Sequence, residues 1–579
     1  MSNKKFEIGL CMAGAVSAGA YTAGVMDYLI EALDEWEKKR DEPGIPQHEV
    51  CISILGGASA GGMTALLTAS TINNRVIPVK FSSEVNLMAE HPENKLYNSW
   101  VDLTGIDMFS KMLGTDDIIG GKVISLLNSK FIDEVADSML RSDLKGWIDT
   151  PAYFKKNNVI PLKVFTTLTN LEGFSYYAGM NAAGRKDKYY MNVHNDYACF
   201  EVMDGVAASS GKAWMPLNFK TGDYLNTAKE AAMATGAFPL GLSPRMLTRE
   251  AKYVQHIPWL QNIFANTPLL KDVVTSLNVD GGVINNEPFE KVRYLLNESL
   301  AEEKKIPFTT QQEKDVACAM LEDLNSDYAT FENTVLMIDP FPSSKNAEFT
   351  FEKEILNIVP KTLSAMLSQM RSKPTEYREA VRDNDASSFI ISPSRDIRDS
   401  KGAVIEEVFG EKAIACGTLS GFGGFLNKEF RIHDYYLGRY NCEIFLRDYF
   451  TIPESALQKN AIFSKGYEDV VDMNKFASLK TEAGAEKEYQ IIPIFTDRTP
   501  FKMPVFSSGQ NWPIITEKEI DKFDTLLRKR VSKILLNIMD LKGINKPLMY
   551  IGTKVVINKL ASKKILGMIK QSLEEWKLL

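Results

Sequence analysis

The sequence predicts an α/β fold, because a buried strand passes into a helix through a turn of small residues twice near the N-terminus. The first unit consists of a strand at 6–12, a Gly- and Ala-rich turn at 13–19 and a helix at 20–39. The second consists of a strand at 50–55, a Gly-rich turn and a helix that continues through 63–70. Apolar residues at three- and four-residue spacing mark the buried face of the first helix.

Composition narrows the class of protein. The 579 residues have 45% hydrophobic and 24% charged side chains, which is ordinary globular usage and long enough for several domains. The net charge of −7 argues against a nucleic-acid-binding protein, which normally has a basic excess. Six scattered cysteines without a C-x-x-C pair suit free thiols in a reducing compartment and predict neither a zinc site nor a disulfide framework.

A stretch without charged side chains runs from Ile8 to Met26. A membrane-spanning helix is normally much richer in Leu, Ile, Val and Phe, and this stretch has a single Leu among many Gly and Ala residues. A signal peptide fits poorly too, because Glu7 interrupts the basic start and glycines punctuate the apolar part. We therefore expect a cytoplasmic protein in which the stretch forms a strand, a turn and a helix.

The second turn contains Gly57-Ala58-Ser59-Ala60-Gly61, which matches G-x-S-x-G. The pattern is common by chance, but here it lies between a strand and a helix. In that context it predicts a nucleophile elbow, in which the serine occupies a strained turn and the helix N-terminus helps to stabilise developing negative charge. Ser59 is therefore the candidate nucleophile, and Gly57 and Gly61 are the candidate elbow glycines.

The base that would activate Ser59 has two candidates. A β-rich run ends in Asp280-Gly281-Gly282, and a carboxylate at a strand end can face the edge of a sheet where α/β proteins place their sites. The alternative is a Ser59–Asp280–His433 triad in the chain order of α/β-hydrolases, which would make the protein an esterase of that class. The elbow comes too early in the chain for that fold, since it follows only the second strand.

Together, the Gly-rich first turn, the G-x-S-x-G elbow and the later D-G-G resemble the patatin-like phospholipase family, and in particular its long bacterial members with a C-terminal extension. The D-G-G lies in VDGGVINNEP, where N-x-P follows it, as in the family. Three further stretches support the likeness: KVFTTLTNLEG, AAMATGAFPLGLSP and NTVLMIDPFPS, the last of which we expect to be the last core strand. The resemblance covers most of residues 5–345 and touches 420–450.

The resemblance implies a three-layer α/β/α sandwich with a mostly parallel central sheet. It also implies a lipid acyl hydrolase of the phospholipase A or esterase type, acting on phospholipid or another lipid ester without a metal or organic cofactor. Catalysis would use a Ser59–Asp280 dyad, with an oxyanion hole formed by the backbone of Gly14, Ala15 and Val16.

The first turn departs from the family pattern. The family loop is D-G-G-G-x-[RK]-G, whereas this chain has only Gly14 and Gly19 in common with it and carries Ala18 at the basic position. Val16 is β-branched and tolerates unusual backbone dihedrals badly. This depleted loop leaves open a further alternative, a catalytically inactive patatin fold that binds lipid or acts as a regulatory protein.

We place a domain boundary near residue 345, with a catalytic domain at 1–345 and a mainly helical region at 346–579. For the region around His433 we predict a structural hydrogen-bond network. From Glu517 to Leu579 there are 14 Lys and Arg against 7 Asp and Glu, a local charge of +7 on a chain of net −7. Because apolar residues recur there at helical spacing, the segment predicts either a helix packed on the core or peripheral contact with an anionic membrane.

Overall fold

The computed structural model describes residues 5–81, 86–102, 105, 108–154, 161–178, 189–203, 213–342, 385–398, 403–480, 486–495, 503–538 and 558–579, with single positions between 351 and 366. The strands are β1 Lys5–Met12, β2 Glu49–Gly57, β3 Lys163–Ala178, β4 Tyr189–Val202, β5 Met215–Leu217, β6 Arg245–Glu250, β7 Val273–Asp280, β8 Asn333–Ile338, β9 Ser388–Ile391, β10 Ser394–Arg398, β11 Val404–Phe409, β12 Thr451–Pro453 and β13 Glu488–Gln490.

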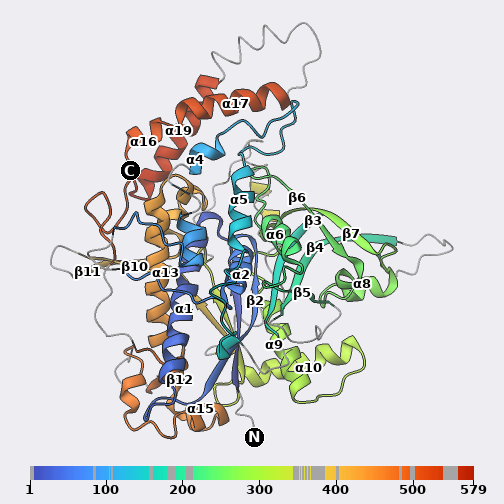
Figure 1. The fold of residues 1–579 in the computed structure, drawn as a ribbon, viewed down its shortest axis with the longest axis vertical. Coiled ribbons are helices and arrows are strands. Elements are labelled where there is room, and N and C mark those ends of the chain that lie inside the picture. Colours follow the sequence, from blue (N-terminus) through green and yellow to red (C-terminus); the bar gives the residue numbers. More distant parts are fainter. Residues whose placement is uncertain are drawn as a thin grey trace.

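The helices surround the strands and extend beyond them at both ends of the molecule (Figure 1). They are α1 Gly19–Lys39, α2 Ser59–Thr71, α3 Lys95–Tyr97, α4 Met108–Met112, α5 Lys130–Met139, α6 Leu225–Thr235, α7 Ala251–Val254, α8 Gln261–Asn266, α9 Phe289–Glu303, α10 Gln311–Asn325, α13 Lys428–Asp448, α14 Glu454–Leu457, α15 Ala461–Gly466, α16 Glu517–Asp521, α17 Asp524–Ile538 and α19 Asn558–Glu575.

One nine-stranded sheet forms the centre of the fold. Its main order is β5-β4-β3-β2-β1-β8-β9, and β7 pairs with β3 and with β6. The run from β3 to β9 is entirely parallel. Antiparallel pairing occurs where β3 meets β4 and β7, and where β6 meets β7. The expected mostly parallel central sheet is therefore confirmed.

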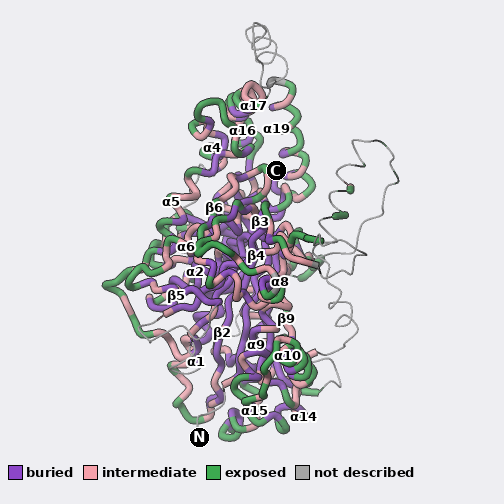
Figure 2. The backbone as a smooth tube through the Cα atoms, turned by 90° about the vertical axis from the view of Figure 1, so that its right-hand side faces the viewer, coloured by how far each residue is buried: buried purple, intermediate pink, exposed green. Residues whose placement is uncertain are grey.

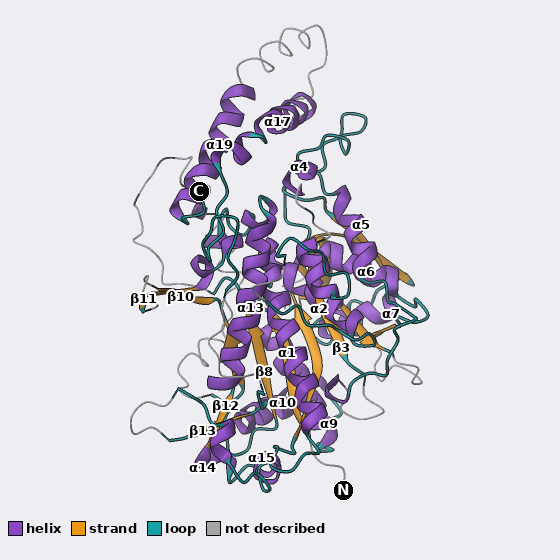
Figure 3. Ribbon diagram, turned by 60° about the vertical axis from the view of Figure 1, so that its left-hand side comes forward, coloured by secondary structure: helices purple, strands orange, loops and turns teal. Residues whose placement is uncertain are grey.

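Helices cover both faces of this sheet and bury alternate residues of its strands. In β1, Ile8 and Leu10 belong to the core shared with α1, α2 and α13, whereas Cys11 belongs to the core that α9 covers. A Cβ on Gly9 would lie 2.4 Å from the Val292 side chain, so α9 rests directly on the strand there. Figures 2 and 3 show the result, a buried sheet between helical layers. This is the α/β/α sandwich that the family resemblance implies.

Both predicted strand–turn–helix units are present. The first is β1 and α1, which account for the uncharged N-terminal stretch, and the second is β2 and α2. Among the described residues, no helix has both the length and the hydropathy needed to span a membrane.

The prediction that the strand at 333–338 is the last core strand is wrong. β9, from beyond residue 345, pairs in parallel with β8 and extends the sheet by one strand. Periodicity could not show this, because a four-residue strand is recognised only by the neighbour with which it pairs. The boundary near residue 345 stays a prediction, although elements on both sides of it contribute to one hydrophobic core.

The long helix α13 packs along α1 so closely that their backbones touch. A Cβ on Gly24 would lie 2.0 Å from the carbonyl oxygen of Tyr435, and a Cβ on Gly438 would lie 2.2 Å from that of Tyr21. Only glycine fits at either position, because the atom opposite is backbone and cannot rotate away. The C-terminal region is thereby joined to the helix that follows the first turn.

Buried charge reinforces the same helix pair. The Arg439 guanidinium of α13 forms ion pairs with Asp27 and Glu31 of α1, and all three side chains are buried. Burial alone would lower the pKa of Arg439, but the two carboxylates outweigh it and raise that pKa. The arginine therefore stays charged, and its removal would take the shared cation away from two buried carboxylates.

We expect Gly438→Ala to lower the unfolding free energy by about 3 kcal/mol, the upper end of ordinary overpacking costs, because the new methyl group meets the Tyr21 carbonyl. Gly567→Ala is the matched control. Gly567 lies inside α19, and a Cβ added there would meet nothing within 4 Å, so its replacement should stabilise by about 0.5–1 kcal/mol through helix propensity. Urea denaturation measures both, and equal effects at the two sites would contradict the close crossing.

Candidate active site

The turn between β2 and α2 is a nucleophile elbow in its geometry. Ser59 has φ = 50°, in the left-handed region that non-glycine residues rarely occupy. A Cβ on Gly57 would lie 2.5 Å from the backbone carbon of Gly61, and one on Gly61 would lie 2.1 Å from the carbonyl oxygen of Met12. Both glycines of G-x-S-x-G are thus required by backbone contact, and the turn presents Ser59 at the start of a helix.

Asp280 is the last residue of β7 and comes next to this elbow through sheet pairing. β7 runs antiparallel to β3 and pairs Asp280 with Leu168, just beyond the point where Gly57 of β2 pairs with Thr166 of β3. The carboxylate therefore lies at the sheet edge where β2 ends. A Cβ on Gly281 would lie 2.1 Å from the Thr167 carbonyl oxygen, so the residue after Asp280 must be glycine.

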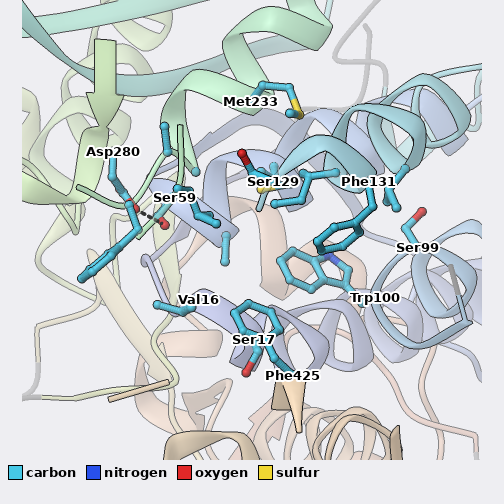
Figure 4. Close-up of a pocket in the computed structure, with 18 of the residues that line it drawn as sticks. Val16, Ser17, Ser59, Ser99, Trp100, Ser129, Phe131, Met233, Asp280 and Phe425 are labelled. Carbon is cyan, nitrogen blue, oxygen red and sulfur yellow. Dashed lines mark hydrogen bonds between the residues drawn. The ribbon is translucent and has the colours of Figure 1, made fainter. Parts of the chain in front are cut away.

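The Ser59 hydroxyl donates a hydrogen bond to Oδ2 of Asp280 at 2.6 Å, marked by the dashed line in Figure 4. The other oxygen, Oδ1, accepts from the backbone N–H of Gly282 at 2.7 Å. Ser59 is 6% exposed and Asp280 is 4% exposed, so little water competes for this contact. Such short distances are typical of O–H donors to a carboxylate. The structure brings the predicted pair together with no side chain between them.

The first turn lies against the same serine. A Cβ on Gly14 would lie 3.0 Å from Cβ of Ser59, which places the loop beside the hydroxyl. The Gly14 amide is engaged, since it donates to the backbone oxygen of Asn286 at 3.2 Å. The Ala15 and Val16 amides have no hydrogen-bond partner among the described residues. Two of the three predicted oxyanion donors are therefore unengaged.

Val16 is held in an unusual conformation. Its φ is 48°, which for a β-branched residue is a genuine outlier that costs of order 1–3 kcal/mol. Backbone strain thus occurs at two places in this site, on the serine and on the loop that faces it. Strained residues persist only where surrounding contacts determine them, and such residues cluster at functional sites.

Two residues that the sequence did not indicate support this arrangement. Thr235, the last residue of α6, accepts the backbone N–H of Ser59 on its hydroxyl at 2.9 Å. Asn286 accepts the Gly14 amide, and its Oδ1 lies 2.4 Å and 2.5 Å from where Cβ atoms on Gly14 and Gly282 would be. Asn286 is the first residue of the N-x-P pattern after D-G-G, and this likeness to the family is the only sequence feature that could have indicated its role. Thr235 lies in the AAMATGAFPLGLSP stretch that supports the family resemblance, but nothing in that stretch singles it out.

His433 is not brought to Ser59. It lies buried in α13, where its Nδ1 is 2.8 Å from Asp434 and its ring packs against Trp512. Burial lowers its pKa, so the imidazole is neutral at neutral pH. The same Asp434 carboxylate accepts the backbone N–H groups of Ala415 and Cys416. The predicted structural network around His433 agrees with these contacts.

An apolar cavity opens from Ser59 and has a volume of about 890 Å³ with its mouth included. Figure 4 shows Ser59 and Asp280 at one end, with Trp100 and Phe131 toward the other. Its apolar lining comes from widely separated parts of the chain and includes Val16, Met63, Trp100, Met108, Phe131, Ile132, Val135, Met139, Met233, Phe238, Leu242 and Phe425. Such a lining suits a flexible hydrocarbon chain with one polar group at the serine.

The fold and site together define an α/β/α protein with a serine nucleophile elbow, a partnered aspartate and an apolar binding cavity. Comparison with known families agrees: residues 10–293 match the model of the patatin-like phospholipases. The chain belongs to the patatin-like phospholipase family. It is also similar to the uncharacterized protein y4iI of Sinorhizobium fredii, with 32% identity over 524 residues that cover 81% of this chain and 69% of the relative. Membership supports lipid acyl hydrolase activity in general.

We expect kcat/KM for p-nitrophenyl esters to rise from butyrate to octanoate by at least tenfold. Each buried CH₂ contributes about 0.8 kcal/mol, or roughly fourfold, and the cavity is lined mainly by apolar side chains. Phe131→Asn should reduce this gain, because it adds a polar group to the lining. Phe409→Asn is the control, since Phe409 is 64% exposed and lies outside the cavity. A flat chain-length profile would contradict acyl binding here.

Proposed function

We propose that the protein is a lipid acyl hydrolase of the phospholipase A or esterase type that uses Ser59 and Asp280 as a catalytic dyad. The observation that carries the proposal is the direct 2.6 Å hydrogen bond from the Ser59 hydroxyl to Asp280 at the end of an apolar cavity. The α/β-hydrolase triad has less support, because His433 pairs with Asp434 and does not line that cavity.

In the first step, Ser59 Oγ attacks the ester carbonyl carbon while its proton passes to Oδ2 of Asp280. The proton then passes to the alcohol oxygen of the leaving group, and the acyl chain stays on Ser59 as an ester. A carboxylate is a weak base for a serine hydroxyl, since an unperturbed Asp has a pKa of about 3.9. Stabilisation of the tetrahedral oxyanion must therefore supply much of the rate.

The proposed oxyanion donors are the Ala15 and Val16 amides, helped by the positive end of the α2 dipole behind Ser59. In the second step, Asp280 takes a proton from a water molecule as the water oxygen attacks the acyl carbonyl carbon. The bond from that carbon to Ser59 Oγ then breaks, Asp280 returns the proton to Oγ, and the fatty acid is released. The same aspartate thus serves both half-reactions. Among the described residues that line the cavity there is no histidine to share that role.

The proposed substrate is a phospholipid or related ester whose acyl chain enters the cavity. The polar part of such a lipid would remain outside the apolar lining, and Arg245, which pairs with Asp133, is a polar side chain on the cavity wall that it could meet. We place the protein in the cytoplasm. The six cysteines are all free, which fits a reducing compartment.

We propose peripheral membrane contact through α17 and α19, which pack together at one end of the molecule (Figure 1). Their exposed surface carries Lys529, Lys533, Lys563 and Lys564, and no described carboxylate pairs with any of these. Exposed apolar side chains accompany them: Ile538, Leu560 and Met568 are each at least 60% exposed. The inward-facing Arg530 has a different role, because it is 1% exposed and pairs with Asp117.

We expect Ser59→Ala and Asp280→Asn each to abolish ester hydrolysis while the protein stays folded. Nucleophile and base act as a unit, so loss of either should cost nearly the same in kcat. Fatty-acid release from phospholipid vesicles, with a thermal melt to confirm folding, measures this. Near-wild-type turnover by folded Ser59→Ala protein would contradict the assignment.

The matched comparison is His433→Gln, which should keep activity within roughly tenfold, below the ~10²–10⁴ of a general acid–base residue. A loss above a thousandfold in folded protein would favour the triad. Labelling of wild-type Ser59 by a fluorophosphonate, absent in Ser59→Ala, would exclude an inactive lipid-binding fold.

We expect replacement of Lys529, Lys533, Lys563 and Lys564 by Gln to weaken binding to anionic liposomes at least tenfold. Each basic residue near an anionic leaflet contributes about 1 kcal/mol, which salt screens within a Debye length. Neutral liposomes and a soluble short-chain ester should be little affected. Sedimentation of liposomes at two salt concentrations measures the change.

The control carries four Lys→Gln changes on exposed lysines elsewhere, at Lys38, Lys304, Lys459 and Lys475. It removes the same charge from other parts of the surface and should leave liposome binding unchanged. Equal loss in both variants would indicate net charge alone, and binding indifferent to lipid charge and salt would rule out docking through these helices.

A further inference from the structure

Ser17, the residue after the strained Val16, connects the first turn to a segment more than four hundred residues away. We call this segment, residues 417–425, the bracing loop. The Ser17 backbone N–H donates to the Gly421 carbonyl at 3.0 Å, and the Ser17 hydroxyl donates to the same oxygen at 2.5 Å. That hydroxyl also accepts the Gly424 backbone N–H at 3.0 Å. Ser17 is 1% exposed, so these bonds are shielded from water.

The bracing loop is itself held in a strained form. Leu419, Ser420 and Gly421 are consecutive and all left-handed, with φ of 55°, 55° and 92°. Runs of such residues are costly for side chains other than glycine. A Cβ on Gly421 would lie 3.1 Å from Cβ of Val16, so the loop presses directly on the strained valine.

The C-terminal helix holds the loop from its other side. Thr418 Oγ1 and Ser572 Oγ of α19 are 2.8 Å apart, and the Leu419 amide donates to Ser572 Oγ at 3.3 Å. A Cβ on Gly417 would lie 2.7 Å from the ring of Trp576. A continuous chain of contacts thus runs from α19 through the bracing loop to Ser17 and Val16.

We propose that Ser17 is a positioning residue that, with the bracing loop, holds Val16 left-handed so that the Ala15 and Val16 amides face the oxyanion formed at Ser59. The inference rests on the proposed function. Glycine would take φ = 48° without strain, but valine must be held there by outside contacts. The C-terminal region supplies those contacts and thereby completes the catalytic site.

The test compares kcat and KM of wild type and Ser17→Ala on a soluble ester. We expect kcat to fall roughly tenfold to a hundredfold, below the ~10²–10³ that deletion of a donor costs, because the amides are displaced and not removed. KM should change by less than about twofold, since the lost interaction forms only in the transition state. Val16→Gly in the Ser17→Ala background should recover part of kcat.

Ser478→Ala is the control for loss of a buried serine hydroxyl. Ser478 also donates to one carbonyl and accepts one amide, those of Asp448 and Lys480, and it does not line the cavity. It should lower the melting temperature about as much as Ser17→Ala without lowering kcat. If both variants lower kcat equally, the effect is general destabilisation and the proposal fails.

Ser572→Ala keeps the proposal testable should Ser17→Ala not fold. It loosens the bracing loop from α19 and should lower kcat severalfold with KM unchanged. Wild-type kcat in whichever of the two variants folds overturns the positioning role. Failure of the proposed function looks different, because wild-type protein would then release no fatty acid and leave Ser59 unlabelled by fluorophosphonate.

Discussion

The fold depends on a backbone contact between two helices that are distant in the sequence. Gly24 of α1 and Gly438 of α13 let the two helices approach until the carbonyl groups of Tyr435 and Tyr21 occupy the space where side chains would be. Buried Arg439 adds ion pairs across the same interface. The first turn directly precedes α1, and the bracing loop precedes α13. The contact between the two helices therefore places the bracing loop against the first turn and links the C-terminal region to the site.

The site itself is made from backbone held in conformations that a free chain avoids. Ser59 and Val16 face each other with φ of 50° and 48°. The first lies in a turn whose own glycines are required, since a Cβ on Gly57 would meet Gly61 and a Cβ on Gly61 would meet the Met12 carbonyl of the neighbouring strand. The second is determined by contacts distant in sequence. This difference explains why the conformation of G-x-S-x-G could be predicted from the sequence, whereas the conformation of the A-G-A-V-S-A-G turn could not.

The same distinction sets how much of the fold and site the sequence predicted. Strand–turn–helix units, the elbow and the Asp280 turn have local causes, namely hydrophobic periodicity and glycines with backbone opposite them, and all of these are present. Thr235 and Asn286 act only because sheet order brings α6 and the turn after β7 beside the elbow. Likewise, β9 is too short to have a period of its own. Family resemblance supplied the layer order, which no local pattern contains.

The proposed Ser59–Asp280 dyad, which has no histidine, would place unusual demands on the rest of the site. Asp280 can accept the serine proton only in the short time that the transition state exists, since serine is far less acidic than a carboxylic acid. The energy that makes the transfer productive must come from groups already aimed at the oxyanion, which cost no reorganisation when the reaction occurs. Rigid placement of Ala15 and Val16 is therefore worth more here than in an enzyme with a stronger base. On this argument, a weak base makes firmly held oxyanion donors necessary, and the strain at Val16 and the bracing loop from the distant C-terminal region are the features that hold them.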